Sequence, residues 1–294
     1  MNELHLHIDG SIRKATLKEW QPNLNVETFG FKNGMSLEKC LACFSSTVSA
    51  LNSSKRITRA VREICEDQSN IGVHRTELRF APHIHGLMPH DAVDAAIRGL
   101  DGKSSLILCG LYGDHPDIIA SFVDIAIRNK KVVGIDLAGG PLPHHKWKIK
   151  DYSMPYRFAA ENGIGRTIHA AEGRHPKEII DAILHLDVQR IGHACTLDAS
   201  ERAVSLVKEK DIVIEACLTS NVHVGVFGSL AEHPIKKWIG KGIRVSICAD
   251  NTLMSRCNTI SELQAARSEC NLNEAEIEWI KASSQFGLFE REKE

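Results

Sequence analysis

The sequence predicts an α/β protein whose parallel strands and helices alternate and close into a (β/α)8 TIM barrel, a single domain over residues 1–294. Eight short β-rich segments recur along the chain, and longer segments of helical periodicity separate them. Eight such strands in a chain of 294 residues favour a closed barrel over an open sheet. No GxGxxG motif follows an early strand, which weakens the alternative of a dinucleotide-binding open sheet.

The elements follow one another without a linker. The expected strands span residues 3–8, 75–80, 105–110, 132–137, 166–170, 190–193, 212–217 and 243–248. The expected helices include residues 36–51, 54–70, 115–129, 175–186, 198–210 and 271–287. Asn273, three residues before Glu276, predicts a capping box at the start of the last of these helices. No low-complexity tract or Pro/Gly/Ser-rich segment indicates a domain boundary.

The composition argues against several classes of partner. A net charge of -1 gives no reason to expect nucleic acid or an anionic membrane as a partner. No apolar run approaches the roughly 20 residues that a membrane span needs, and the N-terminus lacks a secretory signal pattern. Nine scattered cysteines indicate reduced thiols and a cytoplasmic location. Cys40 and Cys43 have CxxC spacing, but on an amphipathic helix without a second pair they are better explained as core residues than as a zinc or redox motif.

Polar residues cluster where the predicted strands end. In "ELHLHIDGS", His5 and His7 share one face of a strand, because successive side chains alternate in direction. The active site of such a barrel lies at the carboxyl ends of its strands. Those ends carry His5, His7, Asp9, His169, Glu172, His193, Asp250 and Asn251. Each histidine alone is explained as a hydrogen-bonded core residue and each aspartate as a helix cap, but neither explanation predicts one shared rim.

A zinc site is chemically coherent with this set. Imidazole nitrogens and a carboxylate oxygen suit Zn²⁺ and leave a position for water. Bound Zn²⁺ lowers the pKa of that water to about 7. Glu172, three residues after His169, is then placed to donate a proton, and a histidine that is not a ligand can deprotonate the water.

Two other histidine pairs are weaker candidates. His83 and His85 follow Pro82 in an expected loop, which indicates a rim or substrate-loop feature more than a pair of metal ligands. His144 and His145 also fall in an expected loop, with no evident partner.

The ordered motifs "ELHLHIDGS", "ELRFAPH", "GIDLAGG", "TIHAAEG", "RIGHACTL", "TSNVHVG" and "SICADN" resemble those of the adenosine deaminase family over nearly the whole chain. The resemblance implies a zinc-dependent hydrolytic deaminase of a 6-aminopurine nucleoside such as adenosine or deoxyadenosine, giving inosine or deoxyinosine and ammonia. A later P-C-x-x-C pair is absent, which separates this chemistry from that of cytidine deaminases.

The resemblance also assigns roles. His5, His7, His169 and Asp250 would hold one Zn²⁺ per chain. Glu172 would protonate purine N1, and His193 would help to deprotonate the attacking water. Gly139 would offer its N–H to purine N3, Asp9 would reach the sugar hydroxyls, and Asn251 would donate to purine N7.

Five positions depart from the family pattern. Asn251 stands where many members have a second aspartate, although some share the asparagine, and Ala171 replaces a usual glycine. Gly140 and Pro141 stand where acidic residues are common, and Leu218 replaces a usual proline. These departures bear more on substrate fit than on metal binding.

The same chemistry on adenine, an N6-substituted adenine or a 5′-modified nucleoside is the main alternative, and a non-catalytic nucleoside-binding member is a second. The sequence leaves the oligomeric state open. Residues 21–35 lead to the next long helix by a shorter path than the usual helical lid segment of the family. This predicts either simple loop trimming or a more open pocket that accepts bulk beyond the sugar.

Overall fold

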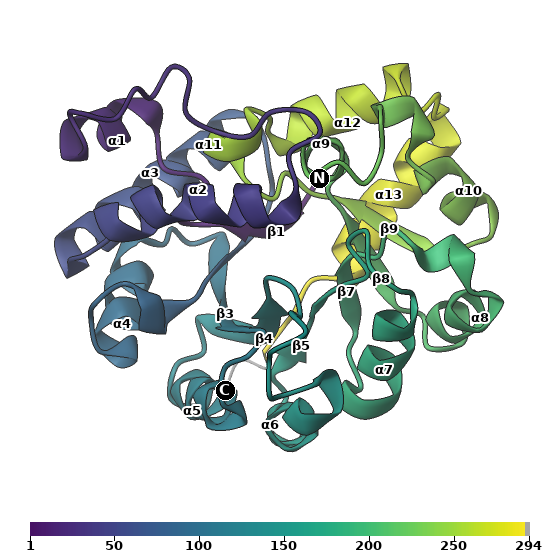
Figure 1. Cartoon of the computed structure of the whole chain (residues 1–294), viewed down its shortest axis with the longest axis horizontal. Helices are drawn as coiled ribbons and strands as arrows, with labels where there is room; N and C mark the ends of the chain where they lie inside the picture. Colours follow the sequence, from purple (N-terminus) through teal and green to yellow (C-terminus); the bar gives the residue numbers. More distant parts are fainter. Residues whose placement is uncertain (292–294) are drawn as a thin grey trace. The chain divides into compact units, whose positions relative to one another are not determined.

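The computed structural model describes residues 1–291, and most of its helices and strands are labelled in Figure 1. Contacts divide the chain into two compact units, each built from separate stretches of sequence. Unit 1 comprises Met1–Ser105, Cys217–Glu232 and Ile247–Asn271. Unit 2 comprises Leu106–Ala216, His233–Ser246 and, within the described residues, 272–291. Whether the whole chain is a single domain stays a prediction.

Unit 1 begins with two parallel strands, β1 (Glu3–His7) and β2 (Thr76–Phe80), which are paired at His7 and Arg79. Its longer helices are α2 (Leu37–Ala50), α3 (Ser54–Asn70), α4 (Pro89–Gly99) and α12 (Thr259–Ser268). Its shorter elements are α1 (Lys14–Trp20), η1 (Pro82–Ile84), α9 (Leu218–His223), η4 (Leu230–Glu232) and α11 (Thr252–Ser255). Helices α3 and α4 pack against each other, and Gly99 permits this because a Cβ there would lie 2.5 Å from the carbonyl oxygen of Thr58.

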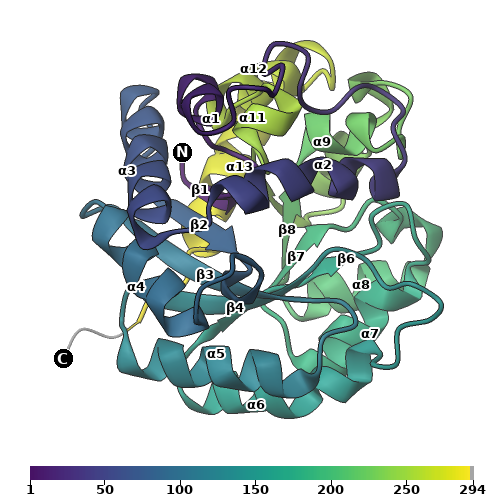
Figure 2. The same cartoon turned by 60° about the vertical axis from the view of Figure 1, so that its left-hand side comes forward.

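Unit 2 contains the remaining strands, and every pairing recorded between them is parallel. They are β3 (Ser104–Leu111, which starts in the last residues of unit 1), β4 (Val132–Ala138), β5 (Gly165–Arg166), β6 (His169–Ala170), β7 (Arg190–His193), β8 (Val213–Ala216) and β9 (Arg244–Ile247). Its helices are α5 (Pro116–Arg128), η2 (Ile149–Tyr152), α6 (Ser153–Glu161), α7 (Lys177–Leu186), η3 (Leu197–Ala199), α8 (Glu201–Glu209), α10 (Ile235–Gly240) and α13 (Glu274–Phe286). Figure 2 shows α5 and α6 side by side, as their contacts require.

The expected strand at residues 166–170 changes its hydrogen-bonding partner part-way along. Its first residues belong to β5, which pairs with β4, and its last residues form β6, which pairs with β7. The intervening backbone continues both ladders, because the Thr167 N–H donates to the Ile135 carbonyl and the Gly192 N–H donates to the Ile168 carbonyl. The eight expected strands therefore correspond to nine observed ones. The Asn273–Glu276 capping box is confirmed at α13.

Residues 21–36, where the family resemblance implies a helical lid, pack within unit 1. Residues 21–36 form no helix, but the Phe31 N–H donates to the Met254 carbonyl over 2.8 Å. Phe31 lies in an apolar cluster with Cys40, Val224 and Met254, against which Phe44 packs. Phe31 therefore holds this segment to the rest of unit 1 by a backbone hydrogen bond and by apolar packing.

Two further expectations concern the cysteines and the membrane. Cys40 is buried and Cys43 is half-buried, and every cysteine within residues 1–291 is a free thiol. Within the same residues, no helix combines the length and the hydropathy that crossing a bilayer requires.

Candidate active site

The first group of candidate residues lies in unit 1, at the end of β1. His5 is fully buried, and the His7 side chain is 13% exposed. Their ring centroids lie 5.2 Å apart, as alternation along a strand requires for two side chains on one face. The predicted juxtaposition of the two imidazoles is therefore present.

Asp250 joins these histidines through the backbone. Its N–H donates to the His5 carbonyl over 2.9 Å, and its carbonyl accepts from the His7 N–H over 2.8 Å. Its Oδ1 lies 3.5 Å from His5 Nε2 and 3.6 Å from His7 Nε2. We call His5, His7 and Asp250 the His-Asp cluster.

These distances suit a shared metal ion. Two atoms that each lie about 2.1 Å from a tetrahedral ion are separated by about 3.4 Å. The donor set of two imidazole nitrogens and one carboxylate oxygen suits Zn²⁺. Cys217 extends the group, since its Sγ and one ligand atom each of His5 and Asp250 lie within 4.8 Å of one another. Cys217 was not predicted as a site residue, although it is the last residue of the strand expected at residues 212–217.

A buried glutamate that the sequence analysis also passed over braces the His-Asp cluster. Glu3 is fully buried, and its Oε1 accepts the His5 N–H over 2.8 Å. Its Oε2 accepts the Ala249 N–H over 2.9 Å and the Thr259 hydroxyl over 2.6 Å. The Glu3 carboxylate therefore links the backbone of His5 to that of Ala249, the residue before Asp250.

The other candidates of unit 1 are also buried. Burial, together with the charge of Asp250, raises the pKa of Asp9 to about 7. Asn251 is 2% exposed, and no hydrogen bond to its Oδ1 exists within the described part of the chain. Gly10 lies against this amide so closely that a Cβ would meet Asn251 Oδ1 at 1.9 Å. A side chain at position 10 would therefore displace Asn251.

In unit 2, His169 at β6 is oriented by two partners. Its Nδ1 lies 3.1 Å from Asp136 Oδ2, and Asp136 on β4 is fully buried. The Tyr112 hydroxyl donates to the His169 carbonyl over 2.7 Å. A carboxylate on Nδ1 leaves Nε2 of the same ring as the metal-binding nitrogen and makes it more basic. Asp136, three residues before Gly139 in "GIDLAGG", is a further functional residue that the sequence analysis missed.

Glu172 and His193 lie near each other in the same unit. Both are buried, and Glu172 Oε1 lies 3.8 Å from His193 Nε2. The His193 ring centroid lies 5.2 Å from that of His169. We call His169, Glu172 and His193 the His-Glu cluster. A carboxyl group and an imidazole at this separation are suitable for handling two different protons of one reaction.

Several of these residues have left-handed backbone conformations that non-glycine residues rarely adopt. They are Ala171 (φ 56°), His193 (φ 66°), Ala194 (φ 50°) and Asp250 (φ 61°). Such a conformation costs roughly 1–2 kcal/mol for a residue with a Cβ. All four follow or end a strand, in agreement with the tendency of strained residues to gather at functional sites. Gly139, directly after β4, has φ 76° without this cost.

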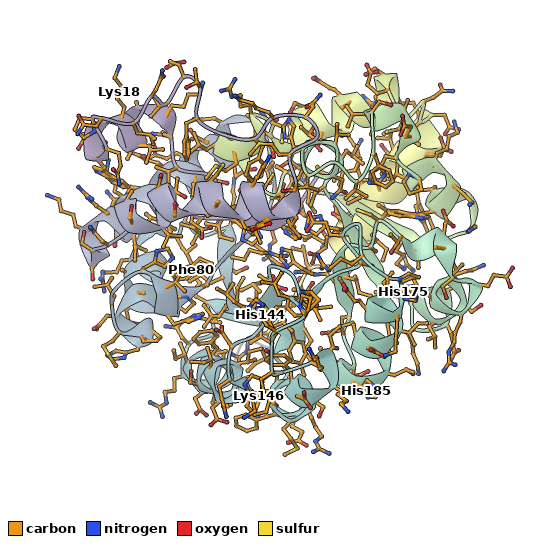
Figure 3. The ribbon with its side chains drawn as sticks, viewed as in Figure 1. Lys18, Phe80, His144, Lys146, His175 and His185 are labelled. Atoms are coloured by element: carbon orange, nitrogen blue, oxygen red, sulfur yellow. The ribbon has the colours of Figure 1, made fainter. Side chains whose placement is uncertain are left out.

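The two weaker candidate pairs, His83 with His85 and His144 with His145, lie outside both clusters. His85 is 2% exposed, packs on the Phe80 ring and lies with Nδ1 3.4 Å from the Val48 carbonyl. His144 and His145 lie in the loop after β4, where Figure 3 labels His144. Neither pair contributes to a possible metal-binding group within residues 1–291.

Comparison with known proteins decides the family. The family model described as "Adenosine deaminase" matches residues 1–289. The chain belongs to the adenosine deaminase family. A probable adenosine deaminase of Dictyostelium discoideum is 32% identical over 94% of this chain, which spans only 38% of that relative. The adenosine deaminase of Clostridium perfringens (strain 13 / Type A) is also 32% identical, over 92% of this chain and 88% of its own length.

Solved structures agree with this assignment. Arabidopsis ADAL complexed with IMP has a TM-score of 0.86 at 26% identity, covering 98% of this chain and 91% of its own. Arabidopsis N6-mAMP deaminase MAPDA has a TM-score of 0.87 at 26% identity, covering 99% and 93%. A cog1816 amidohydrolase from Burkhoderia ambifaria with bound Zn shares the fold at 19% identity, with a TM-score of 0.85 over 98% and 85%. The predicted α/β barrel class and deaminase family are thus confirmed, and this family member is a metal-dependent hydrolase of C–N bonds.

Proposed function

We propose that this chain hydrolyses a 6-aminopurine nucleoside, adenosine or deoxyadenosine, to the 6-oxo nucleoside and ammonia at a site with one Zn²⁺. His5, His7, His169 and Asp250 would hold the ion. The observation that carries the proposal is the spacing of the His-Asp cluster, whose two imidazole nitrogens lie 3.5 and 3.6 Å from one carboxylate oxygen. The orientation of His169 by Asp136 supports the same assignment.

The protein's own groups then divide the proton transfers. When bound, Zn²⁺ supplies an acidified water, whose pKa falls to about 7. Glu172 protonates purine N1 and so makes C6 electrophilic, and His193 takes a proton from the attacking water. Gly139 donates its N–H to purine N3, Asn251 donates to N7 and Asp9 binds the sugar hydroxyls. The buried settings of Glu172 and His193 support these roles, because bulk water would compete for both protons.

The test of this proposal combines metal content, ammonia release and one variant. The purified protein should carry about one zinc per chain and release ammonia from adenosine. Glu172→Gln keeps the side-chain shape but cannot donate the proton, so kcat should fall by roughly 10²-fold or more while zinc stays bound. Full activity in metal-free protein, or near-normal turnover by the variant, would contradict the proposal.

A second candidate substrate is a 6-aminopurine nucleoside 5′-monophosphate, with or without a small N6 substituent. The names of the two Arabidopsis structures refer to a nucleotide complex and to an N6-mAMP deaminase. The short, non-helical segment at residues 21–36 supports this candidate, since a shorter lid leaves more room beyond the sugar.

A substrate panel separates the two candidates. Adenosine, its 5′-monophosphate, N6-methyladenosine 5′-monophosphate and adenine would be compared by ammonia or methylamine release. With an open pocket, a 5′-substituted adenosine should react with kcat/KM within about tenfold of adenosine. A loss of several hundredfold on adding a 5′ group would indicate a closed pocket and leave the nucleoside as the substrate.

A further inference from the structure

The short loop that presents Glu172 has an unusual backbone. Ala171 has φ 56° and Gly173 has φ 69°, so Glu172 lies between two left-handed residues. Glycine adopts this conformation freely, whereas alanine does not, because its Cβ crowds the following carbonyl. The direction of Glu172 therefore depends on whatever holds Ala171 in place.

Glu178, in the first turn of α7, holds Ala171 in place. Its Oε2 accepts the Ala171 N–H over 2.7 Å. Arg174 Nε donates to the same carboxylate, at 2.9 Å from Oε1 and 3.1 Å from Oε2. Both charged side chains are largely buried, with 18% of Arg174 and 14% of Glu178 exposed. Charge-assisted hydrogen bonds of this kind are short and strong, and here two of them meet on one carboxylate.

The residue that completes the arrangement comes from the segment after β7. The Thr196 hydroxyl donates to the Arg174 carbonyl over 2.6 Å, and the Thr196 N–H donates to the Ala171 carbonyl over 3.3 Å. Thr196 follows His193 by three residues. The loop that carries Glu172 is therefore fastened at Ala171 and at Arg174 to the segment that carries His193.

The charge of Arg174 adds a second reason for the position of Glu178. Burial alone would lower the pKa of Arg174, but the carboxylates of Glu178 and Glu172 hold it above its ordinary value, so the group stays cationic. Its Nη1 and Nη2 are buried and have no hydrogen-bond partner among residues 1–291. If Glu178 were removed, Glu172 would be the remaining carboxylate that attracts this cation. A salt bridge between them would oppose the protonation of Glu172.

We propose that Glu178 is a positioning residue for Glu172, because it fixes the left-handed turn at Ala171 and occupies Arg174. The inference rests on the proposed role of Glu172 as the proton donor. It predicts a loss in kcat rather than in KM, since the substrate contacts proposed for Asp9, Gly139 and Asn251 are untouched. It also predicts that glycine at position 171 makes the loop less dependent on Glu178, because glycine needs no support at φ 56°.

The experiment measures kcat, KM, zinc content and thermal unfolding for Glu178→Ala, Ala171→Gly and the double variant. We expect Glu178→Ala to bind about one zinc and to show a kcat at least about tenfold lower, with KM within about twofold of wild type. The double variant should recover at least about threefold of that loss. Asp181→Asn, which removes another carboxylate of α7 that pairs with Lys177, is the matched control and should leave kcat unchanged.

Three outcomes would overturn the inference. A folded, zinc-loaded Glu178→Ala protein with kcat within about twofold of wild type would show that Glu178 only stabilises the fold. A double variant with a kcat no higher than that of Glu178→Ala would show that the turn at Ala171 is not the cause of the loss. If Glu178→Ala does not fold, Glu178→Gln takes its place, with an expected three- to tenfold loss in kcat, and a wild-type kcat would be decisive against the proposal. Glu172→Gln is measured in parallel, so that normal turnover there identifies a failure of the proposed function instead.

Discussion

The His-Asp cluster of unit 1 and the His-Glu cluster of unit 2 are built in different ways. In unit 1, His5 and His7 lie on strand β1, and the backbone of Asp250 bonds to both of them. In unit 2, Glu172 lies in a bend beside the left-handed Ala171, and His193, itself left-handed, ends β7. The Glu178 side chain holds the bend at Ala171. The first arrangement depends on main-chain pairing braced by the Glu3 carboxylate, and the second on side-chain contacts that hold a bend.

This difference corresponds to the work proposed for each cluster. Metal ligands need a fixed separation, which a strand ladder provides through its repeating geometry. Proton donors and acceptors must instead reach out from the strand ends toward a substrate, and sharp turns provide that direction at a cost in strain. Small substitutions should therefore change the activity more when they lie in the bend that carries Glu172 than when they lie on the strand of the His-Asp cluster.

The largest expected effect comes from removing a proposed metal ligand of the His-Asp cluster. His7→Ala should lose both zinc and turnover, with kcat/KM reduced by at least about 10²-fold, because the remaining donors cannot complete a tetrahedral site. The strand itself should stay folded, since its hydrogen bonds are made by the main chain. Metal analysis, ammonia release and circular dichroism would check this.

The control for His7→Ala is His185→Ala on α7, where the imidazole is exposed and is labelled in Figure 3. It should keep zinc and activity. Retention of one zinc and of turnover by His7→Ala would break the comparison, because the His-Asp cluster would then not be the metal site.

The His-Asp cluster was the more predictable of the two clusters from the sequence. Alternation along "ELHLHI" is enough to place His5 and His7 on one face, and this is confirmed. Asp136 was missed because a carboxylate inside a buried strand has no periodic signal of its own, and only its distance to His169 shows its role. Glu3 alternates onto the same face as His5 and His7, but its bonds to Ala249 and Thr259 join distant parts of the sequence and have no local signal.

The turns could not be derived from sequence pattern. The replacement of a usual glycine by Ala171 was visible, but its φ of 56° and the bond from its N–H to Glu178 depend on how the chain packs. The change of partner within residues 166–170 is likewise a property of neighbouring strands. His85 followed a proline in an apparent loop, and nothing local indicated that its ring would be buried.

A smaller effect should follow from crowding Asn251. Gly10→Ala would place a Cβ at 1.9 Å from Asn251 Oδ1, so the amide must move from the position proposed to contact purine N7. We expect kcat/KM to fall by about tenfold, or about 1.4 kcal/mol, with zinc retained. Steady-state kinetics with adenosine would measure it.

Gly102→Ala is the control for Gly10→Ala, since a Cβ there would meet no atom within 4 Å. Its kinetics should match the wild type. If Gly10→Ala left kcat/KM unchanged, Asn251 would not make the contact that is assigned to it.

The smallest expected effect tests the strain in the turns directly. Ala171→Gly should relieve the cost of a left-handed alanine, roughly 1–2 kcal/mol, against a loss of about 0.5–1 kcal/mol from the greater freedom of glycine in the unfolded chain. The net gain in the free energy of unfolding should be no more than about 1.5 kcal/mol, seen as a rise of at most a few degrees in Tm. Differential scanning calorimetry would detect it. Ala182→Gly, at a buried position inside α7, is the opposite case and should lower Tm, because a helix disfavours glycine. A fall in Tm for both variants would mean that the turn at Ala171 stores no strain, and the contrast between the two clusters would then rest on hydrogen bonding alone.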